Sequence, residues 1–274
     1  MPETYRHEPL SVGNVVSAGL RIYRDHFKLY YSLAFRAYLW ILIPIYGWAK
    51  FSALSGAIAR LAFHEVLERP ESSREAWHHV DPRKWSFFLQ GILLSLIYFA
   101  FLFVILILFI VAAVGVGQFV TVDNVASILF AFLLGMVGFF LFIFASIWLA
   151  SRLYISPLPL AIEDDMTATG AIARSWELTS GSVFRIQGII LVAILVTFPV
   201  SLVVQVVSQI VQVIIVANFP PDSVAFNLLS FLFIIALSFI SGALFLPFWQ
   251  SIAAIIYYDL RTRREGLGLE LRDS

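Results

Sequence analysis

The residues of this sequence that could carry chemistry are few and form small groups. The acidic run Glu163–Asp165 could hold a divalent cation together with Asp259. An acidic turn before a helix is also stabilised by the helix dipole alone, and we favour that reading. The adjacent pair His78–His79 cannot share a helix face, so we expect ordinary surface roles. The sequence has no His-Glu-x-x-His pair, phosphate-binding loop, nucleophile elbow or cysteine. We therefore predict no enzyme, no metal and no cofactor.

A second group could recognise lipid headgroups. Arg261, Arg263 and Arg264 form a basic cluster near the end of the chain. Such a cluster could contact anionic headgroups, and it would also help to fix topology. Trp77 and Trp176 are typical of residues that settle at the headgroup level of a bilayer.

Polar residues inside apolar stretches form a third group. These intramembrane candidates are Arg36, Arg60, Gln90, Gln187, Gln205, Gln209 and Gln212. Ionisable groups within membrane spans are functional by default, so the set favours a transport route as an alternative function. For the glutamines at 205–212 we favour a different interpretation, a half-polar helix on the far membrane surface after a bend near Pro199.

Composition requires lipid as the solvent for part of the chain. Of 274 residues, 60% are hydrophobic and 13% are charged, and the mean hydropathy is +0.89. Soluble domains are about 25% charged. Four uncharged blocks could each cross a bilayer, namely Trp85–Phe119, Asn124–Ser151, Ile186–Pro221 and Ser223–Tyr258. Adding less certain spans at about Leu29–Trp48 and Phe51–Val66 predicts an all-α protein with six transmembrane helices.

The distribution of positive charge predicts the orientation. Most of the 18 Lys and Arg residues precede the first span, follow the sixth, or fall in the loops after the second and fourth spans. Lys50 is the only positive charge expected in an outer loop. Positively charged loops face the cytoplasm, so we predict a multi-pass protein of the bacterial cell membrane with both termini cytoplasmic. The net charge of zero gives no indication of nucleic-acid binding.

Similar segments recur along the chain and predict one transmembrane domain, 1–274, built from three parallel repeats. Each unit would be an interfacial helix followed by a hairpin, in residues of about 11–67, 71–165 and 166–262, with a polar tail at 263–274. The units would end in Glu65, Glu163 and Asp259. In the third unit, Thr167 or Thr169 could cap the interfacial helix and Gly181 could end it.

The clearest motifs resemble a known bacterial family. The chain reads Tyr-Asp-Leu-Arg-x-Arg-x-Glu-Gly from Tyr258, and it has Arg-Ser-Trp-x-Leu-x-x-Gly from Arg174 to Gly181. With Pro157–Leu160 and Glu163, these segments resemble the membrane domain of glycerophosphoryl diester phosphodiesterase, over most of the chain. In some members this domain resembles an anchor fused to a soluble catalytic barrel. The barrel's catalytic residues and metal site have no counterpart here, so the resemblance implies a stand-alone membrane module.

The expected function is therefore a non-catalytic module that organises lipid or a partner complex at the cytoplasmic membrane face. The alternative is a transporter or lipid-translocating protein, and the least favoured reading is a membrane enzyme acting on glycerolipids. Expected partners are membrane lipid and either another protein or a second copy of the chain.

Overall fold

The computed structural model describes residues 11–118 and 124–265, which form helices and no strand. In chain order the elements are α1 (Val12–Asp25), α2 (Phe27–Trp40), α3 (Tyr46–Val66), α4 (Ser73–Val80), the short 3-10 helix η2 (Asp81–Arg83), α5 (Lys84–Gly117), α6 (Val125–Leu153), α7 (Pro157–Ile162), α8 (Ala168–Thr179), α9 (Val183–Asn218) and α10 (Val224–Glu265). The all-α prediction is confirmed for these residues. Of the predicted polar tail, only Arg263–Glu265 lies within the described residues.

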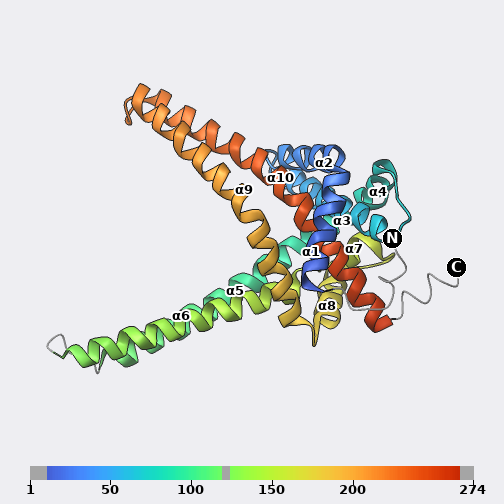
Figure 1. Ribbon diagram of the computed structural model, residues 1–274. Helices are drawn as coiled ribbons and strands as arrows, with labels where there is room; N and C mark the ends of the chain where they lie inside the picture. The colour runs from blue at the N-terminus through green and yellow to red at the C-terminus, as the bar shows by residue number, and fades with distance from the viewer. Residues whose placement is uncertain (1–10, 119–123, 266–274) are drawn as a thin grey trace.

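Two long helical hairpins diverge from one helical body (Figure 1). We call residues 91–117 and 125–148 the α5–α6 arm, and residues 194–218 and 224–242 the α9–α10 arm. The body consists of the other described helices and the ends of the four arm helices that join them. Its core includes Tyr30, Ile58, Ile155, Ile252 and Tyr257, all fully buried. The inner half of α10 runs through this core and packs against α1, α2 and α3.

The arms have the length and the surface of membrane spans. At about 1.5 Å per residue their helices are about 28–40 Å long, against about 30 Å for the hydrocarbon core of a bilayer. Ile215 is the only buried side chain in the described parts of the arms, and their exposed surface is almost entirely apolar. The four arm helices are also the four described helices that are long and apolar enough to cross a membrane.

The first hairpin, α2–α3, is folded into the body, and the prediction of six crossings is not confirmed. α2 has 14 residues, so it is only about 21 Å long. α3 is longer, but protein covers much of it, including Ile58. Lys50, expected in an outer loop, lies 2.7 Å from Asp81, the residue that begins η2 just before α5. The start of α3 and the start of α5 are therefore on the same side of the molecule.

One further expectation needs correction, and another stays open. α9 continues without interruption through Pro199 to Asn218, so no separate half-polar helix lies on the far surface. The helices expected at the membrane interface bury apolar side chains against protein, and their position at the interface stays a prediction. On α1, Val15 and Val16 are covered by protein, and on α8 Leu178 is. The apolar face of a helix can be buried against protein or in lipid, and helical periodicity looks the same in both cases.

Local signals in the third unit are confirmed. The side chain of Thr167 accepts a hydrogen bond from the Gly170 amide and caps α8, while Gly181 adopts φ +77° just after it. Three helices of which the first is no longer than the other two occur three times, as α1–α2–α3, α4–α5–α6 and α8–α9–α10. The order agrees with three repeats, but the repeat itself stays a prediction.

Candidate functional site

The two sequence motifs meet in space at the end of α10. Arg174 of the first motif forms ion pairs with Glu265 of the second and with Glu163, the latter at 3.5 Å. Arg261 reaches Glu265 at 2.9 Å, and the Tyr257 hydroxyl donates to Glu163. We call Glu163, Arg174, Tyr257, Arg261 and Glu265 the motif cluster. Burial alone would lower the pKa of Arg174, but the carboxylates of Glu163 and Glu265 outweigh it and raise that pKa.

Asp259 forms a second ionic contact beside the motif cluster. Its side chain is only 7% exposed and accepts from Arg185 at 2.5 Å and from Arg263 at 3.0 Å. A buried carboxylate is costly unless it is paired, and two guanidinium groups satisfy this one. The contacts fasten the start of α9 to the end of α10. The sequence suggested Asp259 as a possible cation ligand together with Glu163, but in the structure its carboxylate pairs with these two arginines.

The rest of the Arg-Ser-Trp motif binds the end of α6. The guanidinium of Arg152 lies 4.2 Å from the centre of the Trp176 ring and donates to the Trp176 carbonyl at 2.9 Å. The Ser175 hydroxyl donates to the Arg152 carbonyl at 2.8 Å. Cation–π contacts of this kind gain up to about 2 kcal/mol when desolvated. The motif therefore joins α8 to α6 on one side, and through Arg174 to α10 on the other.

Two arginines hold the end of α7. Arg60 donates to the Ala161 carbonyl at 3.0 Å and pairs with Glu71 at 2.8 Å. Arg83 donates to the Leu160 carbonyl at 3.2 Å and to the Glu163 carbonyl at 2.7 Å. The last carbonyls of a helix lack partners within it, and cations suit the negative end of its dipole. Arg60 is thus a structural residue of the body.

The three predicted unit-ending acids have related contacts. Glu65 lies 3.4 Å from His26, which precedes α2, the first helix of its predicted hairpin. Arg83, which precedes α5, binds the backbone of Glu163, and Arg185, near the start of α9, binds Asp259. In each unit, a basic or imidazole side chain at the beginning of the hairpin contacts the acidic residue at its end.

The predicted headgroup candidates have protein partners. Arg264 donates to the Ser180 carbonyl, and Arg261 and Arg263 pair as described above. The Lys50 ammonium lies 4.6 Å from the centre of the Trp77 ring. These contacts do not test lipid binding, which stays a prediction for all five residues.

The intramembrane candidates do not come together. Gln90 donates to the Ser156 carbonyl at 2.6 Å inside the body, at the start of α7, whereas Arg60 binds the end of that helix. Arg36 is exposed on α2, and the amide nitrogen of Gln187 is buried without a hydrogen bond. Gln205, Gln209 and Gln212 lie on the outer part of α9, and they make no hydrogen bond with the described residues.

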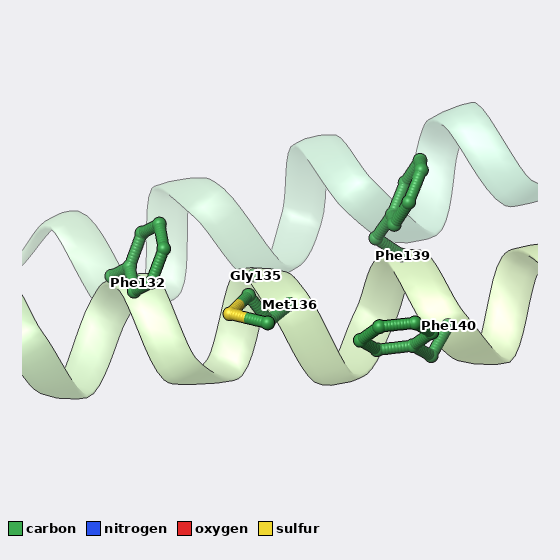
Figure 2. A pocket seen from close by; sticks show the side chains of 5 residues that line it. All are labelled: Phe132, Gly135, Met136, Phe139 and Phe140. Atoms are coloured by element: carbon green, nitrogen blue, oxygen red, sulfur yellow. The ribbon is translucent and has the colours of Figure 1, made fainter.

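A surface hollow on the α5–α6 arm is separate from all these residues. Five residues of α6 line it, and Figure 2 shows Gly135 and Met136 between Phe132 on one side and Phe139 and Phe140 on the other. Its lining is almost wholly apolar, as expected of a surface that faces lipid tails. No polar candidate reaches it.

Within residues 11–118 and 124–265, no three or more His, Cys, Asp or Glu side chains gather in a way that could hold a metal ion. Sequence reasoning missed the partners Glu71 of Arg60, Asp81 of Lys50 and Arg152 of Trp176. Each pair joins separate elements or an element and a loop, so no local spacing reveals it. Of these pairs, the sequence singled out only Trp176, as part of a motif, and it gave no indication that Arg152 is its partner.

The fold is that of a membrane protein in which a helical body carries two hairpins long and apolar enough to cross a bilayer. The sequence model described as the membrane domain of glycerophosphoryl diester phosphodiesterase matches residues 125–265, and the chain belongs to this family. The match covers about half of the chain, from α6 to the end of α10, not most of it as the motifs indicated. No curated protein and no solved structure matches the chain.

Proposed function

We propose that the chain is a non-catalytic membrane module that crosses the bilayer four times and organises lipid or a partner complex at the cytoplasmic face. One observation carries the proposal. Charged residues of the two family motifs join separate helices of the body: Arg174 of α8 pairs with Glu265 of α10, and Asp259 of α10 pairs with Arg185 of α9. The arms add an apolar surface without a lysine or arginine. The motifs thus act as fasteners that hold two hairpins on one body.

The charge distribution supports a cytoplasmic body. The described lysines and arginines lie in residues 21–84, 152–185 and 261–264, all in the body. Positive charge is retained on the cytoplasmic side, so both arms would cross outward and return. Four crossings leave both termini cytoplasmic, as six would. Asp222 lies at the outer end of the α9–α10 arm, and Asp123 falls outside the described residues.

The contacts of the three unit-ending acids support the repeat as well. His26–Glu65, Arg83–Glu163 and Arg185–Asp259 each close a hairpin at the body. In the first unit the hairpin is short and stays with the body, while in the other two it extends into an arm. We therefore propose three units of common design, of which two cross the membrane.

The glutamines of α9 support a partner within the membrane. Gln205 lies near the middle of its arm helix and is exposed, as is Gln209 one turn later. An unpaired amide is costly in hydrocarbon, and amides commonly bind across helices there. Because an amide both donates and accepts, the same stripe on a second copy would be complementary to it. The alternative of a transport route would need these residues to share a cavity with Gln90 and Arg60, which the body holds elsewhere.

Reconstitution tests the proposal. The purified protein would be placed in phospholipid vesicles and assayed for lipid scrambling, small-solute leakage and glycerophosphodiester hydrolysis, with empty vesicles as the reference. We expect none of the three activities, together with bound lipid or a bound protein in native mass spectrometry of gentle detergent extracts. Flux abolished by Gln205→Leu would establish the transport alternative in place of the module. Hydrolysis that scales with protein would sink the non-catalytic reading.

A further inference from the structure

The turn between α2 and α3 has an exposed apolar surface that the body does not use. We call residues Trp40–Trp48 the tip. Leu42 is 60% exposed and Ile45 is 57% exposed, and Ile43, Tyr46 and Trp48 are exposed as well. Isolated exposed apolar side chains are ordinary, but a contiguous group of large ones marks an interaction surface.

The tip lies where both arms leave the body. Tyr38, just before it, packs against Phe239 of α10 with 5.9 Å between ring centres, and its ring also abuts Gly242. On the other side, Tyr46 meets Trp85 at the start of α5, with ring centres 6.5 Å apart. Figure 1 shows the α2–α3 turn on the side of the body from which the arms extend. Any bilayer that the arms cross therefore begins at the level of the tip.

Most backbone amides of the tip form hydrogen bonds within the protein, so they need no water. The amides of Ile41, Leu42, Ile43, Tyr46 and Gly47 all donate to carbonyls of residues 38–44, and Pro44 has no amide hydrogen. The indole of Trp48 donates to the Ile41 carbonyl at 3.2 Å. Backbone groups in hydrocarbon must find partners within the protein, and here most of them do. Gly47 is required, because a side chain there would collide with the Trp40 carbonyl.

The charges around the tip suit a membrane surface. Lys50 is neutralised by Asp81 and surrounded by the rings of Trp40, Tyr46 and Trp77, at 4.6–5.9 Å from their centres. Arg36 is exposed one turn before the tip, and it has no carboxylate partner among the described residues. A long cationic side chain at this depth can extend to a lipid phosphate, while Trp and Tyr prefer the headgroup level.

We propose that the tip inserts into the cytoplasmic leaflet without crossing it, with Arg36 at the phosphate level. This inference rests on the proposed membrane crossing of the two arms. The occupant of the apolar surface is the lipid of the leaflet that surrounds the arms, because that surface is continuous with theirs at Phe239 and Trp85. The α2–α3 turn would then occupy space among the lipids that lie between the two diverging arms.

Spin labels test the depth of the tip, and the cysteine-free sequence makes single labels clean. Ile43→Cys and, independently, Leu42→Cys would carry a nitroxide in vesicles of phosphatidylethanolamine and phosphatidylglycerol. Val137→Cys in the α5–α6 arm and Glu177→Cys on α8 are the matched references. Collisions with oxygen, which enters lipid, and with a water-soluble nickel complex would be measured by power saturation.

We expect labels 42 and 43 to be accessible to oxygen and several-fold less accessible to nickel than label 177, at a shallower depth than label 137. Nickel accessibility equal to that of label 177, with label 137 embedded, would overturn the tip insertion alone. Protection of 42 and 43 from both reagents would also overturn it, since it would mean that protein covers the tip. A nickel-accessible label 137 would contradict the membrane crossing itself.

Discussion

The body and the arms are built from the same secondary structure, and four of the helices pass from one to the other, yet their side chains follow opposite rules. In the body, carboxylates and guanidinium groups are gathered and paired, as at Asp259 with Arg185 and Arg263. In the arms, charged groups are missing along the described helices and large apolar side chains face outward. α10 shows the change within one helix, because its side chains become buried from Ala243 onward.

The proposed membrane crossing accounts for the difference: each helix continues, while its surroundings change from protein and water to lipid at the base of each arm. Outside the body, apolar side chains need no protein cover because lipid tails are as apolar as they are. Inside it, the ordinary rule of a water-exposed protein returns, with apolar residues covered and charges paired or exposed. A charge moved between the two regions should therefore show the largest effects.

An arginine in an arm should have the largest effect. Val137→Arg places a charge near the middle of α6, where insertion costs about 2.5–3.5 kcal/mol. Leu20→Arg makes a comparable change at an exposed position of α1, where we expect about 0.5 kcal/mol or less. Carbonate extraction of membranes would measure the inserted fraction of each variant. Equal insertion of both variants would remove the distinction between arm and body.

Breaking the motif cluster should have the next largest effect. Arg174→Ala leaves Glu163 and Glu265 with one partner fewer in a partly buried site, which costs about 2 kcal/mol. The melting temperature in detergent should fall by about 4–8 °C for a chain of this size.

Arg24→Ala is the matched control, because its side chain is 76% exposed and paired only with its neighbour Asp25. Such surface pairs contribute about 0–1 kcal/mol. If both variants melt together, the motif cluster does not fasten the body.

The smallest effect concerns the exposed polar side chains on α9, Gln205 and Gln209, which are exceptions to the apolar surface of the arms. Ser208→Cys lies between them in the sequence, and we expect it to form disulfide-linked dimers in vesicles, whereas Val137→Cys on the other arm does not. Adding Gln205→Leu and Gln209→Leu should weaken dimerisation by about threefold to thirtyfold, since interhelical hydrogen bonds in membranes contribute about 0.6–2 kcal/mol. A cross-linking yield unchanged by the two leucines would contradict pairing through the amides.

The sequence predicted those structural features that depend on one local segment alone. The long uncharged runs predicted the four arm helices, and Thr167 and Gly181 predicted the limits of α8, because caps act within one turn. The first hairpin was not predictable in this way. Its apolar pattern is the same whether lipid or protein covers it, and the decision rests on contacts such as Lys50–Asp81 between separate helices. The motif cluster was predicted as two motifs but not as one site, since 91 positions separate Arg174 from Glu265.

The continuity of α10 has a mechanical consequence. A single helix runs from Val224 at the outer end of an arm to Glu265 in the motif cluster, so it acts as a lever with its fulcrum where Tyr38 abuts Gly242. Pro247, which lacks an amide hydrogen, is the weakest point of the rod, and it lies just inside that fulcrum. A tilt of the outer part of α10 would therefore act on the pair between Glu265 and Arg174, unless the helix bent at Pro247.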